Sequence, residues 1–455
     1  MTTPDDGRRH LVVIGGGPAG TAAAIRAGTL GARVTLVEKD VVGGAAHLWD
    51  CIPSKTMVAS AHRRRNMRTA PSLGVPGVER EVDLAALNER MARISADLSA
   101  GQMDVLDSQG IERIDGFGRF TGPHSAEADT ADGTIGLRFD LALVSTGSAP
   151  RIPAWAEPDG ERVLTTRHAY GLAELPRHVV VVGAGVTGVE FTNIWASLGS
   201  AVTLVVSRQQ VLPHRDPEVA AVLEADFLER GVRLVKGARA EGIERDHDDV
   251  VVVTDDGRRI RGSHVLLAIG SVPLTDGLGL EAAGVATDGG YVQVDEFNRT
   301  SVPHIYAAGD VTGQMPLSSV ATMQGRKLAH HAMGRDVRPI DYRRVAQAVF
   351  TEPEIASVGL EEADAAAEGR RIRTTKVPFA TNSRSVIQDA TRGFVKLISD
   401  PVTHQVLGGT IVGYRASELI GIIALAVQAR VHVDDVVDTL MVHPSLCESI
   451  SEAAD

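Results

Sequence analysis

Cys51 and Lys55 are the two side chains of residues 43–55 whose types and spacing suit redox chemistry. A cysteine thiolate can donate charge, and a position at a helix N-terminus lowers the pKa of the thiol. Lys55 stands one helical turn after Cys51, so it would place a cation on the same helix face. The chain has one other cysteine, Cys447. The alternative for Cys51 is a small, inert, buried apolar residue, which is the usual role of a lone cysteine.

Residues 11–38 predict a unit that binds the pyrophosphate of a dinucleotide. An apolar strand at 11–14 runs into the glycine motif at 15–20, followed by a helical stretch at 21–30 and a second strand that ends in Glu38. The glycines let the backbone approach a pyrophosphate at the helix N-terminus, where amides and the helix dipole favour an anion. Glu38 is expected to accept hydrogen bonds from a ribose. The full context argues against a glycine turn that only packs a helix on a sheet.

The same unit occurs again at residues 178–206, with a strand, a glycine motif at 183–188, a helix at 189–198 and a second strand. Two such units predict two dinucleotides, and therefore a flavin and a nicotinamide. The second strand ends in Val206, and Ser207 and Arg208 follow. An acid at this place would bind the 2′-hydroxyl of NAD, whereas a nearby arginine suits the 2′-phosphate of NADP. We expect NADPH to be preferred or both to be used, unless Arg208 is only a solvated surface charge.

Further strands and turns organise the rest of the chain. Strand ends at 143–147 and 266–270 each close a Rossmann-type unit, and Pro150, Pro153 and Pro273 indicate boundaries nearby. Between them, 216–231 predicts an amphipathic helix that precedes a strand at 232–235, and 250–258 predicts a strand that enters a hairpin turn. A strand at 304–308 runs into Gly309-Asp310, where Asp310 could also be a simple helix cap.

Residues 43–55, with Cys-Ile-Pro-Ser-Lys after a Gly-Gly pair, resemble the active-site segment of the pyridine nucleotide-disulfide oxidoreductases, the family of dihydrolipoamide dehydrogenase and glutathione reductase. Residues 304–311 are similar to the family's second flavin signature, 350–360 to the opening strand of its dimerisation domain, and 442–448 to its closing signature. The resemblance implies an α/β fold with two Rossmann-like dinucleotide-binding domains, for FAD and NAD(P), and a C-terminal α+β dimerisation domain. The expected boundaries are 1–150 and 274–340 for FAD, 151–273 for NAD(P) and 341–455 for dimerisation.

The chain departs from the family pattern at Ala46. Relatives have the first of two cysteines there, five positions before the one that Cys51 matches. A disulfide relay needs two sulfur atoms within bonding reach, and an alanine methyl supplies none. Cys447 could meet Cys51 only across a dimer, under demanding geometry. Ser318-Ser319 also replace the Ala-His of many relatives, which puts the contacts at that edge of the flavin in doubt.

The resemblance also implies roles for individual residues. It places Cys51 beside the flavin ring and Lys55, paired with Glu190, near the flavin N5, where a cation would meet developing negative charge. His443 and Glu448 match an acid–base pair supplied by the other subunit, which we expect to protonate a quinone; a satisfied interface histidine is the alternative. No metal ligand is expected. The expected cofactor contacts are Gly15, Gly17, Pro18, Ala19, Gly20, Glu38, Lys39, Gly44, Ala45, Lys55, Gly118, Thr146, Gly147, Gly183, Gly185, Val186, Thr187, Gly188, Ser207, Arg208, Gly270, Gly309, Asp310, Leu317 and Ala321.

Composition narrows the classes of partner and location. The net charge of -12 argues against nucleic acid or an anionic membrane surface as the main partner. Residues 1–10 carry two acids where a signal peptide has its basic region, and no apolar run reaches membrane-spanning length. Two cysteines are too few for a disulfide framework, so we expect a cytoplasmic protein.

The sequence therefore predicts an FAD-dependent NAD(P)H:quinone oxidoreductase, similar to the lipoamide dehydrogenase-like quinone reductases that also lack the paired cysteines. NADPH or NADH would reduce FAD, and the flavin would reduce a quinone-type acceptor directly. The alternatives are a dihydrolipoyl dehydrogenase-like enzyme, a soluble NAD(P) transhydrogenase, a single-thiol peroxidase or coenzyme A disulfide reductase that cycles Cys51, and a flavin-binding scaffold. Lys55, Glu190 and His443 count against the scaffold, because binding alone requires none of them. The resemblance also implies a homodimer.

Overall fold

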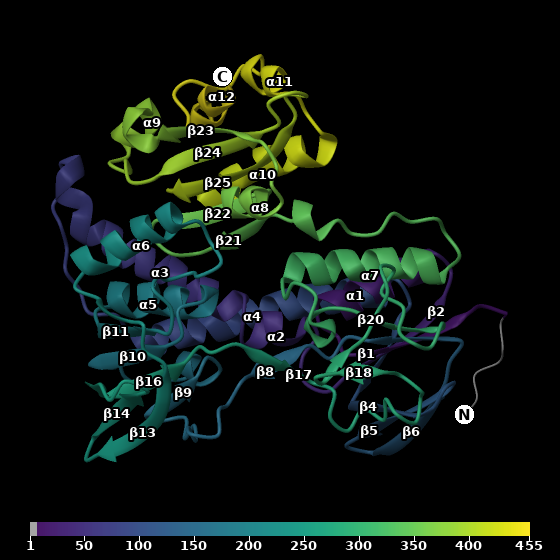
Figure 1. Cartoon of the computed structure of the whole chain (residues 1–455). Coiled ribbons are helices and arrows are strands. Elements are labelled where there is room, and N and C mark those ends of the chain that lie inside the picture. Colours follow the sequence, from purple (N-terminus) through teal and green to yellow (C-terminus); the bar gives the residue numbers. More distant parts are fainter. Residues whose placement is uncertain (1–6) are drawn as a thin grey trace. The chain divides into compact units, whose positions relative to one another are not determined.

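The computed structural model describes residues 7–455, which form two compact units (Figure 1). The first comprises the described residues up to Ser54, with Asn88–Arg151 and Ser271–Ile340. The second comprises Lys55–Leu87, Ile152–Gly270 and Asp341–Asp455. Among the described helices, none combines the length and the apolar character needed to cross a bilayer.

A five-stranded parallel sheet forms the centre of the first unit. Its strand order is β20-β7-β1-β2-β3, so the chain moves one way from β1 through β2 and then returns to the other side of β1. The carboxyl ends of strands at such a reversal form the usual crevice for a dinucleotide. The strands are β1 (His10–Ile14), β2 (Arg33–Glu38), β3 (Glu112–Asp115), β7 (Leu141–Val144) and β20 (Ile305–Ala307).

Alternate side chains of β1 enter two different cores. Leu11 and Val13 pack with α1 (Pro18–Thr29) and α7 (Ser318–Ala332), which lie side by side along the sheet (Figure 1). Val12 and Ile14 pack on the other face, against an antiparallel sheet. Burial on both faces explains why residues 11–14 of β1 are all apolar. That second sheet consists of β4 (Phe117–Gly122), β5 (Ser125–Thr130) and β6 (Gly133–Arg138).

Further strands and helices complete the first unit. Strands β8 (Ser148–Pro150) and β17 (Ser271–Pro273) pair antiparallel, and so do β18 (Thr287–Asp288) and β19 (Tyr291–Val292). The other elements are α2 (Gly44–Leu48), η3 (Asp310–Thr312) and α4 (Leu84–Ser108), whose Leu106 enters the core shared with α1.

The second unit repeats the parallel sheet, in the order β12-β11-β10-β16-β9. One face packs on the antiparallel sheet β13-β14-β15. The predicted helix at 216–231 is confirmed as α6 (Pro217–Glu229), and the predicted hairpin is the β14–β15 turn. The elements are β9 (Val163–Thr165), β10 (His178–Val182), β11 (Ala201–Val206), β12 (Arg233–Lys236), β13 (Ala240–Asp246), β14 (Asp249–Thr254), β15 (Arg259–Gly262), β16 (His264–Leu267), α3 (Ile52–Thr69), α5 (Val186–Leu198), η1 (Ala70–Leu73) and η2 (His168–Tyr170).

The part of the second unit from Asp341 to Asp455 contains a sheet of a different kind. Five antiparallel strands lie in the order β21-β22-β25-β24-β23, and α10, α11 and α12 share a core with this sheet. The elements are η4 (Tyr342–Arg344), β21 (Gln347–Val349), β22 (Glu354–Gly359), α8 (Glu362–Ala367), β23 (Arg373–Pro378), η5 (Phe379–Thr381), α9 (Ser383–Ile387), β24 (Phe394–Ser399), β25 (Val406–Gly413), α10 (Ala416–Ala429), α11 (Val433–Val437) and α12 (Glu448–Ala454).

Candidate active site

The two glycine motifs turn from strand to helix in the same way. The first glycine of each has a left-handed backbone, with φ of 102° at Gly15 and 108° at Gly183. A Cβ atom would lie 2.4 Å from the carbonyl oxygen of Ser145 at Gly15, and 2.3 Å from that of Ala268 at Gly183. Both the φ angle and the close approach therefore require glycine.

The remaining motif glycines shape an open cradle at each helix start. A Cβ atom would lie 1.9 Å from the carbonyl oxygen of the motif's first glycine at Gly20, and 1.8 Å at Gly188. Gly17 and Gly185, which are the N-caps of α1 and α5, instead face open space: a Cβ atom there would meet nothing within 4 Å. First-turn amides have no partner within their own helix. Space and donors together fit a pyrophosphate at both helix starts.

Glu38 lies at the carboxyl end of β2, beside the first motif. Its Oε2 accepts a hydrogen bond from the Gly16 amide at 2.5 Å, and its Oε1 accepts one from the Asp40 amide at 2.8 Å. Burial raises the pKa of Glu38, and these backbone donors oppose that shift. A carboxylate offers about four acceptor sites, so Glu38 can also accept from a ribose. Lys39 follows it and is exposed.

The turn before α2 is hydrogen-bonded to the first glycine motif, residues 15–20. The Gly43 amide donates to the carbonyl oxygen of Gly16 at 2.9 Å. At Gly44, where φ is 57°, a Cβ atom would lie 2.9 Å from the Cα of Gly17. Ala45, the next residue, accepts hydrogen bonds at its carbonyl oxygen from the amides of Trp49 and Asp50. The segment that contains Ala46 and leads to Cys51 is thereby held beside the first cradle.

Other expected FAD contacts lie near the carboxyl edge of the same sheet. Gly118 packs so closely on the ends of β1 and β2 that a Cβ atom would lie 3.0 Å from an Ile14 side-chain carbon. Thr146 Oγ1 donates to the carbonyl oxygen of Leu274 at 2.7 Å, and Gly147 has a φ of 73° beside open space. Gly118 follows the end of β3, and Thr146 and Gly147 follow the end of β7, at the carboxyl edge of the sheet where a dinucleotide would run.

Asp310 begins η3 and is held next to α7. Its Oδ2 accepts a hydrogen bond from Ser148 Oγ at 2.8 Å. Burial raises the pKa of Asp310, and the Ser148 hydroxyl opposes that shift. Gly309, which is the N-cap of η3, donates its amide to Gln324 on α7 at 2.7 Å, and a Cβ atom on it would lie 3.6 Å from the Cβ of Ala321. Leu317, the N-cap residue of α7, completes the expected flavin residues here.

Cys51 directly precedes α3, and its Sγ lies 3.1 Å from Ser318 Oγ at the first residue of α7. The sequence identified Ser318 as a departure from relatives, but it did not predict that the hydroxyl contacts the thiol. The signal that could have led to this contact was the serine itself, since a hydroxyl is a suitable partner for a thiolate.

The second unit contains an anchored ion pair. Lys55 Nζ donates to Glu190 Oε2 at 2.7 Å, and the main-chain amide of Phe350 donates to Glu190 Oε1 at 2.9 Å. The Glu190 side chain is 5% exposed and that of Lys55 is 34% exposed, so the cation faces outward from a buried carboxylate. Lys55 Nζ also lies 5.0 Å from the centroid of the Phe350 ring. Sequence reasoning missed Phe350, because a backbone amide leaves no signal in a sequence.

The second cradle is open to solvent on the nucleotide side. Val186 and Thr187 are exposed at the start of α5, and Ser207 and Arg208 are exposed where β11 ends. Gly270, with a φ of 96°, follows the end of β16 and faces open space. This arrangement suits a second dinucleotide whose ribose end reaches Arg208.

His443 and Glu448 meet at the start of α12. His443 Nδ1 lies 2.7 Å from Glu448 Oε1, and the Ser445 amide donates to Glu448 Oε2 at 2.8 Å. These contacts, that of Ser445 first, lower the pKa of Glu448. The His443 side chain is 71% exposed, so its ring is open to solvent. Cys447 Sγ lies 2.9 Å from Ser445 Oγ.

Comparison with known proteins agrees with the geometry. Residues 9–325 match the family described as pyridine nucleotide-disulphide oxidoreductase, and residues 345–454 match its dimerisation domain. The chain is 46% identical to the "NAD(P)H dehydrogenase (quinone)" of Mycobacterium tuberculosis, covering 98% of this chain and 93% of that protein. It is 34% identical to the dihydrolipoyl dehydrogenase of Bacillus subtilis, covering 98% and 95%.

The crystal structure of LpdA from Mycobacterium tuberculosis superposes with a TM-score of 0.94 at 46% identity, covering 98% of this chain and 99% of that one. These findings confirm the predicted family and fold class. The family uses FAD and NAD(P)H, as predicted, and the two cradles fit them. The chain belongs to the pyridine nucleotide-disulphide oxidoreductase family.

Proposed function

We propose that this chain is an FAD-dependent NAD(P)H:quinone oxidoreductase whose flavin reduces a quinone-type acceptor without a disulfide relay. The observation that carries the proposal is Ala46, in a chain that keeps Lys55, Glu190, His443 and Glu448. A disulfide requires two sulfur atoms about 2 Å apart, and the position that would pair with Cys51 carries a methyl group. The 46% identical relative named NAD(P)H dehydrogenase (quinone) supports the same activity.

The cradle at residues 15–20 would hold the pyrophosphate of FAD, with Glu38 at a ribose and Asp310 at the ribityl chain. The cradle at residues 183–188 would hold NAD(P)H. When bound, the flavin supplies a centre that takes a hydride from NAD(P)H and gives it to the acceptor. The absence of an acid after Val206, together with the exposed Arg208, favours NADPH or the use of both nucleotides.

Lys55 would hold a fixed positive charge beside the isoalloxazine ring. Glu190 positions it through a 2.7 Å hydrogen bond, and the Phe350 amide fixes the carboxylate in turn. A preorganised cation stabilises negative charge that develops during hydride transfer without reorganising at that moment. Cys51, hydrogen-bonded by Ser318, would contact the ring as a charge donor and not as half of a relay.

His443 would donate a proton to the acceptor oxygen as negative charge develops there. Glu448 orients the imidazole through Nδ1. The dimerisation domain indicates a homodimer, and we propose that each His443–Glu448 pair serves the flavin of the other subunit. The domain boundaries that we propose are those expected from the sequence, with 151–273 for NAD(P)H and 341–455 for dimerisation.

The net charge of -12 and the two cysteines support a cytoplasmic enzyme that acts on a small molecule and does not bind nucleic acid. Dihydrolipoyl dehydrogenase is the second candidate, because relatives of that name share about a third of the residues. The missing sulfur at Ala46 opposes it, since no internal disulfide can accept the electrons of dihydrolipoamide.

The test is anaerobic reduction of the purified flavoprotein by NADPH, followed by reoxidation with menadione or with lipoamide in separate runs. We expect fast reoxidation by menadione and none by lipoamide. Fast lipoamide turnover would overturn the proposal, because it would require another sulfur, such as that of Cys447, in place of the missing one. Failure of both NADPH and NADH to bleach the flavin would instead indicate a redox-inactive flavin protein.

A further inference from the structure

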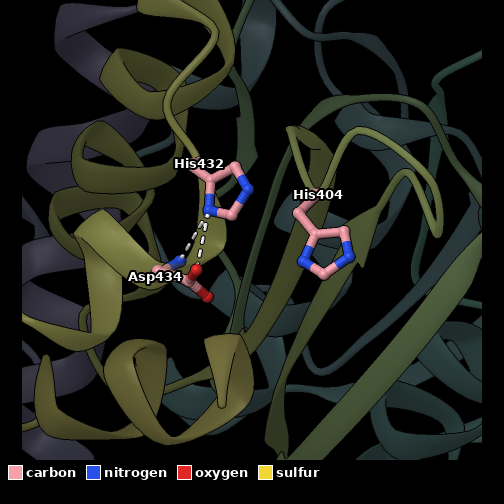
Figure 2. Close-up of side chains that lie close together, drawn as sticks. All are labelled: His404, His432 and Asp434. Atoms are coloured by element: carbon pink, nitrogen blue, oxygen red, sulfur yellow. Dashed lines mark hydrogen bonds and ion pairs between the residues drawn. The ribbon is translucent and has the colours of Figure 1, made fainter.

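His404, His432 and Asp434 lie together in the C-terminal part of the second unit (Figure 2). One metal-ligating atom of each lies within 4.8 Å of the others. The two imidazole rings are stacked, with their centroids 5.1 Å apart and an angle of 18° between their planes. His432 Nδ1 lies 3.2 Å from Asp434 Oδ2.

Main-chain contacts hold the two histidines together. His404 lies in the turn between β24 and β25, and its carbonyl oxygen accepts from the Val433 amide at 2.9 Å. Gln405 forms an isolated antiparallel bridge with His432, which is the N-cap of α11. Asp434 lies in the first turn of that helix. The turn and the helix start therefore present three ligands from fixed backbone positions.

We propose that His404, His432 and Asp434 bind one divalent transition-metal ion of the zinc class. Two imidazole nitrogens and one carboxylate oxygen are the ligand types that Zn²⁺ accepts, with a solvent water as the fourth ligand. Ligands at about 2 Å from a common ion lie at most about 4 Å apart. The ligating atoms of this cluster lie within 4.8 Å of one another, and His432 Nδ1 is 3.2 Å from Asp434 Oδ2, so small rotations of partly exposed side chains bring all three into range.

The proposed ion would join two segments that the sequence keeps apart. It would tie the β24–β25 turn to the start of α11, and its charge would be partly balanced by Asp434. None of its ligands belongs to the residues that we assign to the flavin, the nicotinamide or the acceptor. The sequence did not predict this site, because the two histidines meet only through main-chain contacts between the β24–β25 turn and the start of α11.

The test is a calorimetric titration of the FAD-bound full-length protein with ZnCl₂, in the wild type and in the variants His404→Asn and His432→Asn. Asparagine tolerates the left-handed backbone of His404, where φ is 57°, and it is a favoured helix N-cap at 432. Each variant therefore removes an imidazole and keeps the local backbone. We expect one zinc ion per wild-type chain and an affinity at least about tenfold lower in each variant, since even outer-shell changes have effects of that size.

His247→Asn is the matched control. His247 also has a positive φ, of 54°, and its side chain is exposed beside the carboxylate of Asp246. It belongs to no described three-residue cluster, so its loss should leave the zinc isotherm unchanged. Asp434→Asn keeps both histidines and should also weaken zinc binding. If a histidine variant fails to fold, the zinc affinity of Asp434→Asn tests the proposal in its place. Equal zinc affinity in the wild type, His404→Asn and His432→Asn would overturn the proposal, as would no binding to the wild type.

Discussion

Lys55 Nζ donates to Glu190 Oε2 at 2.7 Å, while the other carboxylate oxygen of Glu190 accepts from the Phe350 amide at 2.9 Å. Glu190 is therefore positioned by the backbone as well as by its cationic partner. Replacing Lys55 should therefore lower the stability of the fold less than replacing Glu190. Removing Glu190 would leave both a partly buried ammonium group and a backbone donor without their acceptor.

Lys55→Met should slow reduction of the flavin by NADPH, because the cation that meets developing negative charge is lost. It should also lower the free energy of unfolding by about 1–3 kcal/mol, because the buried carboxylate keeps only the Phe350 donor. Lys55→Arg, which keeps the charge, is the matched control and should retain more of both properties. The measurements are anaerobic stopped-flow bleaching and denaturant unfolding. An unchanged bleaching rate in Lys55→Met would exclude the proposed role.

Glu448→Gln should shift the pH dependence of quinone turnover. The Ser445 amide and His443 lower the pKa of Glu448, so the carboxylate stays charged below the usual titration range of glutamate. Its contribution to stability is accordingly present above the unfolded pKa and is lost as pH falls through the lowered folded value. The substitution replaces the carboxylate beside His443 Nδ1 with a neutral amide. If the Glu448 carboxylate supports proton donation by His443, turnover in the variant should fall relative to the wild type, and most at pH values where the wild-type carboxylate is charged.

The measurement is the pH profile of kcat with menadione for the wild type, Glu448→Gln and His443→Ala. We expect His443→Ala to reduce turnover by about 10²-fold or more, the usual size of a general-acid contribution. Ser451→Ala, a change of a small polar residue on the same helix, serves as the control. A menadione rate that is unaffected by His443→Ala would refute proton donation by this residue.

The sequence predicted the fold and most of the local geometry because glycine spacing and strand patterns record backbone requirements directly. A Cβ atom would meet a carbonyl oxygen at Gly15, Gly20, Gly183 and Gly188. Only glycine fits there, so the spacing of glycines in the sequence marks these positions. The amide of Phe350 and the hydroxyl of Ser318 were not predicted as partners. Such contacts depend on which distant segments meet in three dimensions, and neither a backbone amide nor a common serine marks that in the sequence.

Asp310→Asn should weaken FAD binding more than it weakens the fold. Burial raises the pKa of Asp310 in the folded protein. The folded state therefore loses stability relative to the unfolded state as pH rises through this raised pKa. A neutral amide at this position does not ionise and so avoids that loss. The FAD-free variant should therefore melt no lower than the FAD-free wild type at neutral pH. Its affinity for FAD should fall by about tenfold or more, because a charge-assisted hydrogen bond from a ribityl hydroxyl to a carboxylate becomes a weaker bond to a neutral amide oxygen.

Thermal melting with and without FAD, together with a fluorescence titration of FAD, measures both effects. Ser148→Ala is a useful companion, because it removes the 2.8 Å donor to Asp310 and keeps the carboxylate. If Asp310→Asn bound FAD as tightly as the wild type, the ribityl role would be wrong. A large fall in the melting temperature of the FAD-free variant would show that Asp310 supports the fold instead.

Arg208→Ala should raise the KM for NADPH and leave the KM for NADH nearly unchanged. Arg208 is exposed where β11 ends, and no acid stands at the end of that strand to bind a ribose hydroxyl. A guanidinium group binds the 2′-phosphate, which NADH lacks. Loss of binding that is equal in ground state and transition state raises KM without changing kcat. Arg233→Ala, at an exposed arginine that begins the neighbouring strand, is the control. Steady-state kinetics with each nucleotide decides the matter: equal effects on NADPH and NADH would mean that Arg208 is a general surface charge.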